Sequence, residues 1–428
     1  MNKKIRVFET FAGIGSQHKA LEILKKAGVI DYEIAATSEW DMWANIAYNA
    51  IHHDNKNIAK NITDEEIRNF LSNFSHSFDS KKPTTVDYIM KKERITRELL
   101  YSAFKNANNL GSIVEITGEE LVEKAGRIDL ITYSFPCQDL SMAGSFHGFN
   151  QGMAKGSGTR SGLLWEIERI LTELDRIEQK PKYLLLENVK NMISDKHLPD
   201  YKMWLKRLNE LGYNTQTFLL KSNDYGSPQI RQRVYAISIL RNCSKNFIDT
   251  FNTTGKIISE IKIVDKSKEY KISKEMFDII QLDEQNNKIL IESIESTPNK
   301  TPSRLKMFNE NPKLFSLKNL DQNYLKNKNG YFLPNSRTIT TKQDRHPNAG
   351  VIDLRETNFD PIKLGLTGKA RYRFLTTRET YMLMGFDSKD FNKVIKHGVM
   401  QKEILYRQAG NSIVVNVLVA LFEYMNSF

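Results

Sequence analysis

Cys137 is the residue best placed for nucleophilic chemistry. It lies in the run Ser134–Ser141, directly after the β-like stretch Ile128–Tyr133. Open α/β sheets bind ligands beyond the carboxyl ends of their strands. A thiol at that position becomes a nucleophile if a helix N-terminus or nearby cations lower its pKa. Most lone cysteines are inert buried residues, and we assign that role to Cys243.

A carboxylate and two arginines accompany other apolar strands. Glu187 follows the apolar run Tyr183–Leu186, where poor solvation can keep a carboxyl group protonated as a general acid. Arg231 and Arg233 belong to Gln229-Ile230-Arg231-Gln232-Arg233 at the start of a further strand, and alternation predicts that they share one face. Paired guanidinium groups suit a phosphate or a carbonyl edge. A solvated strand-end carboxylate and an exposed basic edge strand are the alternatives.

A glycine-containing turn near the start of the chain predicts a ligand site. Phe11-Ala12-Gly13-Ile14-Gly15 joins the strand Ile5–Glu9 to a helix from about Ser16 to Lys26. Glycines in such a turn let a ligand approach the backbone and the helix N-terminus. The third glycine of the dinucleotide-binding pattern is missing, so an ordinary tight turn fits equally well.

Glu39 and Trp40 follow the second expected strand, Glu33–Ser38. A carboxylate at this position after a glycine turn can accept hydrogen bonds from ribose hydroxyls. The neighbouring indole ring can stack on a base. The pair predicts an adenosine-containing cofactor, with a plain core aromatic as the alternative for Trp40.

Strand and helix patterns alternate through the first part of the chain. Further strands are expected at Thr215–Leu220 and Val234–Ile239, and a long helix at Leu163–Ile177. Strands separated by helices predict an α/β fold with a doubly wound, mostly parallel sheet.

Two regions depart from this alternation. Residues of about 51–110 form a polar, helix-leaning insertion within an expected catalytic domain of residues 1–241. Residues 242–370 are rich in Asn, Lys, Ser and Thr, with scattered β-like pieces such as Ile289–Ile291, and predict a smaller irregular domain. Residues 371–428 are expected to return to the first domain.

Composition excludes several classes of protein. The 428 residues include 62 Lys and Arg against 51 Asp and Glu, and the resulting charge of +11 is compatible with a polyanionic partner. Two cysteines exclude a disulfide framework and a zinc site built on several thiolates, so no metal is expected. Without a long apolar run or a signal-peptide core, we expect a cytoplasmic protein with no membrane contact.

The order and spacing of the motifs resemble the DNA cytosine-C5 methyltransferases over nearly the whole chain, except residues of about 51–110 and 242–370. Pro136-Cys137-Gln138, Glu187-Asn188-Val189 and Gln229-x-Arg231-x-Arg233, in that order, are the most specific part of the resemblance. Arg373 to Glu379 resembles the motif that packs the recognition domain. Gly410-Asn411-Ser412, by itself a turn and helix N-cap, resembles the motif that returns to the cofactor site.

The resemblance implies a class I, Rossmann-like methyltransferase that uses S-adenosyl-L-methionine, with residues 242–370 as its target-recognition domain. The implied catalytic residues are Cys137, Glu187, Arg231 and Arg233. The implied cofactor residues are Phe11, Ala12, Gly13, Ile14, Gly15, Glu39, Trp40, Glu115, Pro136, Leu163, Asn411 and Ser412. Glu115 stands where the family usually has Asp for the adenine amino group, and a capping or surface role is its alternative.

The same resemblance implies double-stranded DNA as the partner, read in the major groove by the smaller domain. The candidate DNA-contacting residues are Ser141, Gln229, Gln343, Arg345 and Asn348. Thr132–Ser141 and Thr159–Glu166 look closest to the mollicute enzymes that methylate CG dinucleotides. Thr338–Asn348 differs from the corresponding run of those enzymes, so a CG target is not carried over.

The chemistry implied by the family is addition of the Cys137 thiolate to C6 of a flipped cytosine, followed by methylation of C5. Glu187 would supply a proton to N3. One of Arg231 and Arg233 would hold the O2 edge of the base and the other a phosphate, and the sequence does not say which. Ser141 and its loop would close over the flipped nucleotide.

Three alternatives differ in substrate or class. A branch of the family methylates transfer RNA, but the long segment 242–370 favours duplex DNA. A non-catalytic DNA-binding protein has no use for a thiolate at Cys137. A cysteine hydrolase would need a base, and neither His18 nor His197 is suitably placed.

We expect a monomer, either accompanied by a separately encoded restriction endonuclease or acting as an orphan or phage methylase.

Overall fold

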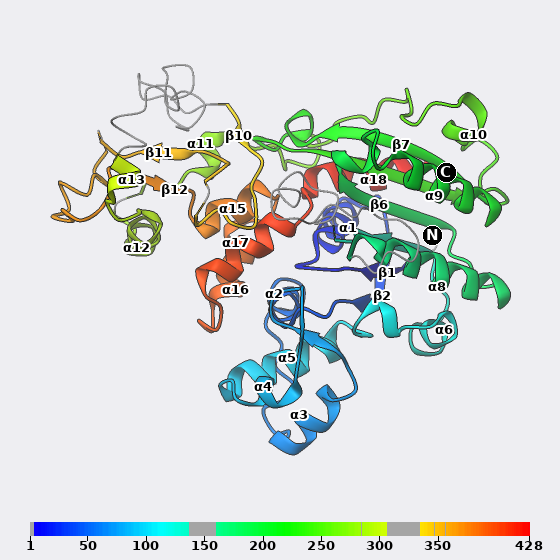
Figure 1. The fold of residues 1–428 in the computed structure, drawn as a ribbon, viewed down its shortest axis with the longest axis horizontal. Coiled ribbons are helices and arrows are strands. Elements are labelled where there is room, and N and C mark those ends of the chain that lie inside the picture. Colours follow the sequence, from blue (N-terminus) through cyan, green and yellow to red (C-terminus); the bar gives the residue numbers. More distant parts are fainter. Residues whose placement is uncertain (1–3, 137–159, 284, 306–333, 346, 356) are drawn as a thin grey trace. The chain divides into compact units, whose positions relative to one another are not determined.

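The computed structural model describes residues 4–136, 160–283, 285–305, 334–345, 347–355 and 357–428 (Figure 1). The chain divides into two compact units. Unit 1 contains Met1–Lys221, Gln232–Val264 and Val417–Phe428, and unit 2 contains Ser222–Arg231 and Asp265–Asn416. The functional division into catalytic and target-recognition domains stays a prediction.

Unit 1 is built on a six-stranded sheet with the order β2-β1-β5-β6-β9-β7 (Figure 1). Its strands are β1 (Ile5–Thr10), β2 (Tyr32–Ser38), β5 (Leu130–Tyr133), β6 (Tyr183–Val189), β7 (Tyr213–Lys221) and β9 (Gln232–Leu240). β1, β2, β5 and β6 pair in parallel, whereas β9 runs antiparallel to both β6 and β7. The predicted α/β class with a mostly parallel sheet is confirmed.

The helices of unit 1 other than the short α10 bury apolar residues. The helices are α1 (Ser16–Lys26), α2 (Met42–His52), α6 (Gly118–Ala125), α8 (Leu164–Arg176), α9 (Leu198–Glu210) and α10 (Thr250–Thr254). In α8, Leu164, Ile167, Leu171 and Leu174 recur at helical spacing and are all buried. They join one core cluster with sheet residues such as Leu184. Burying these faces fixes the loops at the strand ends.

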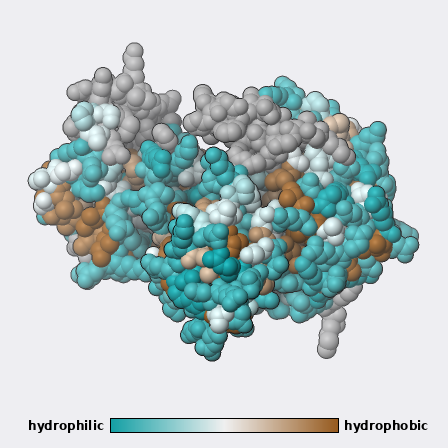
Figure 2. Space-filling view, turned by 60° about the horizontal axis from the view of Figure 1, so that its bottom comes forward, coloured by the Kyte–Doolittle hydropathy of each residue, from teal (hydrophilic) through white to brown (hydrophobic). Residues whose placement is uncertain are grey.

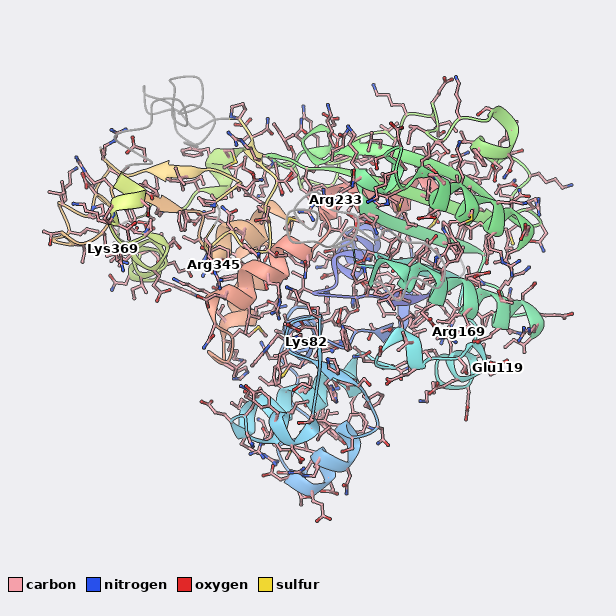
Figure 3. The ribbon with its side chains drawn as sticks, viewed as in Figure 1. Lys82, Glu119, Arg169, Arg233, Arg345 and Lys369 are labelled. Carbon is pink, nitrogen blue, oxygen red and sulfur yellow. The ribbon has the colours of Figure 1, made fainter. Side chains whose placement is uncertain are left out.

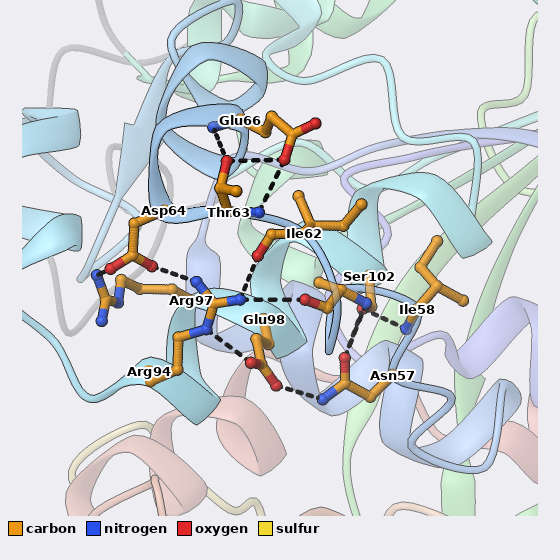
Figure 4. A network of polar contacts seen from close by, with 11 residues as sticks. Asn57, Ile58, Ile62, Thr63, Asp64, Glu66, Arg94, Arg97, Glu98 and Ser102 are labelled. Carbon is orange, nitrogen blue, oxygen red and sulfur yellow. Dashed lines mark hydrogen bonds and ion pairs between the residues drawn. The ribbon is translucent and has the colours of Figure 1, made fainter.

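The polar insertion folds around three helices and a short hairpin. These elements are α3 (Asp64–Leu71), β3 (His76–Ser77), β4 (Pro83–Thr84), α4 (Val86–Met90) and α5 (Arg94–Asn106). Arg94 donates to Glu98 (2.7 Å), to the Ala59 carbonyl (3.2 Å) and to Asp64, and Arg97 also donates to Asp64 (2.8 Å) (Figure 4). This network ties α3 to α5, and α5 contacts α2.

Unit 2 has less regular structure. β8 (Gln229–Ile230) pairs with β10 (Ser336–Arg337), and β11 (Val351–Asp353) pairs with β12 (Tyr372–Phe374). Its helical segments are η4 (Ser222–Tyr225), α11 (Met276–Ile279), α12 (Asn287–Ser296), α13 (Pro302–Leu305), α15 (Thr377–Leu383), α16 (Ser388–Ile395) and α17 (Lys402–Asn411). α18 (Val415–Met425) crosses the boundary between the two units.

The β-like reading of Ile289–Ile291 is wrong, because these residues lie in α12. The Asn286 side chain accepts hydrogen bonds from the backbone N–H groups of Lys288 and Ile289 and so caps the helix. Three consecutive apolar residues, two of them β-branched, are typical of a strand. The cap at Asn286 stabilises a helix here instead.

A fully buried ion pair, Arg373–Glu379, lies inside unit 2. Its closest N–O distance is 2.7 Å, and neither side chain is exposed. The Glu379 carboxylate also accepts the backbone N–H of Thr376 (2.8 Å) and of Gln281 (2.8 Å). Because every oxygen of the buried carboxylate has a donor, the charge is compensated locally.

Hydrophilic side chains cover most of the coloured surface in the view of Figure 2. By length and composition, the helical stretch Lys402–Met425 could cross a membrane, but 83% of its most apolar window is buried inside the protein. Core helices of soluble proteins pass the same test, so this stretch is weak support for a membrane span.

Candidate functional site

The glycine turn after β1 leaves its backbone open at one position and closely packed at another. Gly13 (φ 56°) and Gly15 (φ 79°) both adopt the left-handed conformation that favours glycine. A Cβ atom on Gly13 would have Phe11 O, 3.9 Å away, as its nearest neighbour. On Gly15 it would lie 2.2 Å from Nε2 of His52. A ligand can therefore approach the backbone at Gly13, whereas Gly15 allows close packing against α2.

The Glu39 carboxylate organises the end of β2. Its Oε2 accepts the Gly13 N–H (2.9 Å) and its Oε1 accepts the Asp41 N–H (2.8 Å). Burial, followed by the nearby Asp41 charge, raises the pKa of Glu39 to about 7. Each ionised oxygen keeps a further lone pair for a hydroxyl donor. Free acceptor positions on Glu39, followed in the chain by the half-buried Trp40, fit an adenosine group.

Asn109, which the sequence analysis did not single out, fixes the same turn. Its Oδ1 accepts the backbone N–H of Glu39 (3.1 Å) and of Gly111 (3.0 Å). Its Nδ2 donates to the Glu39 carbonyl (2.9 Å) and to Asn45 (2.7 Å). Its position between the insertion and the next helix carries no periodic signal, so only the fold reveals this role.

A buried polar cluster supports the glycine turn from within unit 1. The Tyr48 hydroxyl donates to Glu9 Oε2 (2.9 Å), and His18 Nδ1 lies 2.8 Å from the same hydroxyl. His52 stacks on His18 with ring centroids 4.1 Å apart and lies 3.1 Å from the Ile14 carbonyl. Burial raises the pKa of Glu9 to about 8 and lowers that of His52 to about 3. The cluster is therefore largely uncharged at neutral pH.

Glu187 and Arg233 meet across neighbouring strands of unit 1. Val189 lies opposite Arg233 and Glu187 lies opposite Tyr235 in the β6–β9 register, so Glu187 and Arg233 are diagonal neighbours on one face. Arg233 Nε is 3.3 Å from Glu187 Oε1, and the two side chains are 16% and 11% exposed. Sequence reasoning proposed both residues but not this ion pair. Whether Glu187 is held protonated stays a prediction.

Asn188 connects this pair to the segment that carries the predicted nucleophile. Its Nδ2 donates to the Phe135 carbonyl (3.1 Å), directly before Pro136. Asn188 is buried, so the link is protected from water. Cys137 and Ser141 lie outside the described residues.

The expectation that Arg231 and Arg233 share a face of one strand is wrong. Strand pairing is interrupted at Arg231, between β8 and β9, and Arg231 belongs to unit 2. Its guanidinium donates to the carbonyls of Ile339 (3.1 Å), Gly410 (3.1 Å) and Ser412 (2.9 Å), and the residue is 4% exposed. Arg231 therefore ties its own segment to two others of unit 2, at Ile339 and at Gly410 to Ser412.

The predicted DNA-contacting residues of unit 2 differ in accessibility. Gln229 is fully buried, donates to the Leu383 carbonyl (3.2 Å) and accepts the Ile339 N–H (3.0 Å). Gln343 is also fully buried. Arg345 (Figure 3) and Asn348 are exposed, so their polar groups can reach an external partner. DNA contacts by all four residues stay predictions.

The remaining predicted cofactor residues lie in both units. In unit 1, Ala12 and Ile14 are buried in the turn, Phe11 and Leu163 are half-buried, and Glu115 is exposed in the helical turn η1 (Ile113–Glu115). In unit 2, Asn411 is exposed and Ser412 is buried.

No group of His, Cys, Asp and Glu that could hold a metal ion occurs among the described residues.

Comparisons with known proteins agree on one enzyme class. The family model described as C-5 cytosine-specific DNA methylase matches residues 71–427. The type II methyltransferase M2.ScrFI of Lactococcus lactis subsp. cremoris is 34% identical over 425 residues, which cover 98% of each chain. The orphan methyltransferase M.SssI of Spiroplasma monobiae is 39% identical over 280 residues, which cover 63% of this chain and 70% of that protein.

Solved structures show the same fold at low sequence identity. The Dnmt2 methyltransferase of S. pombe gives a TM-score of 0.58 at 17% identity, with 99% of this chain and 98% of that chain covered. The Entamoeba histolytica methyltransferase EhMeth gives a TM-score of 0.57 at 16% identity and similar coverage. At this identity the likeness establishes the fold alone.

We expect Arg231→Met to lower the free energy of unfolding by roughly 2–5 kcal/mol, because three buried carbonyls lose their charged donor. Urea unfolding of the full chain measures the change. Arg345→Met is the matched control, since its side chain is 70% exposed and its loss should change stability by less than about 0.5 kcal/mol. Equal unfolding curves for the two variants would contradict a structural role for Arg231.

Proposed function

Because the chain belongs to the C-5 cytosine-specific DNA methylase family, we propose that it methylates C5 of one cytosine within a fixed short sequence of duplex DNA. The chain is a DNA cytosine-5 methyltransferase of the restriction-modification or orphan type, and DNA is its substrate. The family resemblance inferred from the motifs is thereby confirmed. The proposal adds the methyl donor, the flipped base and the covalent intermediate.

The ion pair between Glu187 and Arg233 is the observation that best supports this proposal. Both groups lie at the sheet edge where β6 ends and β9 begins, and Asn188 binds the segment leading to Cys137. An acid, a guanidinium and a thiol from three segments of unit 1 are the groups that addition to a cytosine ring requires.

In the proposed reaction the Cys137 thiolate adds to C6, and the electron pair moves toward N3 and C5. Glu187 delivers a proton to N3 as charge accumulates there. Arg233 holds Glu187 and offers N–H donors to the O2 edge of the base, whereas Arg231 acts through the backbone of unit 2. As C5 is methylated, N3 returns its proton to Glu187. The C5 proton is then lost to a base and the thiolate is eliminated, which restores the aromatic ring.

S-adenosyl-L-methionine, when bound, supplies the methyl group. Glu39 is assigned to the ribose hydroxyls, Trp40 to the base, and the open backbone at Gly13 to the close approach of the ligand. Glu115 is kept as the adenine-side carboxylate. These assignments fit the donor and acceptor groups described above.

Sequence reading belongs in this proposal to the segment around Arg345 and Asn348, which are exposed. The target sequence itself is left open. We further propose a cytoplasmic monomer that protects DNA from a separately encoded endonuclease or acts as an orphan enzyme.

Expression in a host free of cytosine methylation should leave bisulfite-resistant cytosines in one short sequence context. Cys137→Ser should abolish this protection and the covalent adduct with 5-fluorocytosine DNA, because a hydroxyl is a far weaker nucleophile, while DNA binding persists. Cys243→Ser is the matched control and should behave as wild type. The expectation that Cys243 is buried is wrong, because it is an exposed free cysteine far along the chain from the predicted catalytic motifs. Complete conversion with soluble wild-type protein would refute the proposed activity.

Glu187→Gln should slow the chemical step by roughly 10²–10⁴-fold, because an amide cannot deliver the proton to N3. Single-turnover methylation measures the step, and calorimetry should find cofactor affinity unchanged. Glu119→Gln, at an exposed position of α6 (Figure 3), is the control for loss of one carboxylate. A collapse of cofactor affinity in Glu187→Gln would place this residue in the cofactor site instead.

Binding of S-adenosylhomocysteine should weaken as the pH falls through about 7. Glu39 has a pKa raised to about 7, and only its ionised form offers both oxygens to hydroxyl donors. His18 and His52 remain neutral in this range, because burial lowers their pKa. Calorimetry between pH 6 and 8.5 tests this. Glu39→Gln should bind weakly with no such slope, and a slope that persists in this variant would point to another group.

A further inference from the structure

A short segment of the insertion, Ser75–Ser80, reaches the proposed cofactor site. The Ser80 hydroxyl donates to Asp41 Oδ2 (2.6 Å), and the Ser77 N–H donates to the Trp40 carbonyl (2.9 Å). The Ser75 hydroxyl donates to the Glu115 carboxylate. Three residues of this segment thus bind the turns that carry the proposed ribose-side and adenine-side carboxylates.

Asp41 links Ser80 to Glu39, the proposed ribose-side carboxylate. Its Oδ1 accepts the backbone N–H of Trp43 (2.9 Å) and of Ala44 (3.2 Å), which caps α2. Its own N–H donates to Glu39 Oε1 (2.8 Å). Movement of Asp41 would therefore move one of the two donors that hold Glu39.

The Ser75–Ser80 segment is itself firmly held. His76 is fully buried, with Nε2 2.9 Å from the Leu71 carbonyl at the end of α3. Asp79 Oδ1 accepts the backbone N–H of Lys81 (2.8 Å) and of Lys82 (3.0 Å). The network of Figure 4 anchors α3 in turn. The insertion therefore presents its serine hydroxyls at fixed positions.

The backbone of Ser80 is unusual for a serine. Its φ of 59° lies in the left-handed region, where a residue with a Cβ atom is disfavoured by about 1–2 kcal/mol relative to glycine. Glycine would satisfy the backbone better, but it has no hydroxyl for Asp41. The contact with Asp41 accounts for serine at this strained position.

We propose that Ser80 and Ser75 are positioning residues for the cofactor, Ser80 through Asp41 and Glu39, and Ser75 through Glu115. The insertion then contributes to cofactor binding through these two serines. This inference rests on the proposed function, since it takes S-adenosyl-L-methionine as the ligand.

Calorimetric binding of S-adenosylhomocysteine to the full chain tests the proposal. Ser80→Gly removes the hydroxyl while relieving the backbone, so affinity should fall roughly 3- to 10-fold without loss of stability to urea. Ser75→Ala should also weaken binding. Ser72→Ala is the matched control, because its hydroxyl contacts only the Arg68 carbonyl within the insertion and should leave affinity unchanged.

Two further readouts separate positioning from a general structural effect. Asp41 is the charged side chain that raises the pKa of Glu39, and the other groups facing Glu39 are the backbone N–H groups of Gly13, Trp40 and Asp41. The Ser80 hydroxyl dipole screens the Asp41 charge from Glu39, so without it that charge should oppose ionisation of Glu39 more strongly and the pH midpoint of binding should rise. Ser80→Asn, which tolerates positive φ and can donate through its amide, should restore part of the affinity.

The outcomes distinguish this inference from the function on which it rests. Wild-type affinity in both Ser80→Gly and Ser75→Ala would overturn it and leave the proposed function standing. Weaker binding together with lower stability and an unmoved pH midpoint would also overturn it, because the role would be structural only. Absence of binding to the wild-type chain would remove the cofactor assignment and this inference together.

Discussion

The antiparallel pairing of β9 with β6 is the constraint on which the proposed active site depends. Parallel strands alone would bring only their carboxyl ends to the functional edge of the sheet. Because β9 runs the other way, its first residues arrive at the end of β6, and the register makes Glu187 and Arg233 diagonal neighbours. A slip of one residue would move Arg233 to the opposite face of the sheet. The register therefore sets the chemistry as directly as the residue types do.

Local patterns were enough to predict the sheet, the glycine turn and the carboxylate after β2, because alternation, helical spacing and glycine are properties of neighbouring residues. They failed where partners are distant in sequence. Arg231 and Arg233 look equivalent, yet Arg231 is bound by carbonyls more than a hundred residues away. Ile289–Ile291 reads as a strand, and the cap at Asn286 makes it a helix. Asn109 and Ser80 carry no local signal, because their roles are hydrogen bonds across the fold.

The carboxylates of Glu39 and Glu187, which lie at two strand ends of unit 1, have different surroundings. Two backbone N–H groups hold Glu39, and burial, followed by the nearby Asp41 charge, raises its pKa to about 7. Glu187 has a guanidinium beside it. Environment, more than residue type, separates the two proposed roles.

The return of the last residues to unit 1 has a consequence for biosynthesis. Tyr424 donates to Gln216 on β7 (2.8 Å), and the Phe428 ring packs against Phe247 with centroids 5.0 Å apart. These partners are separated by the whole of Asp265–Asn416, which belongs to unit 2. During synthesis on the ribosome, α18 is made only after residues 265–416. Unit 1 therefore lacks this helix until unit 2 has been translated. Its sheet has an incomplete cover during that interval, which makes the nascent chain a natural client for chaperones.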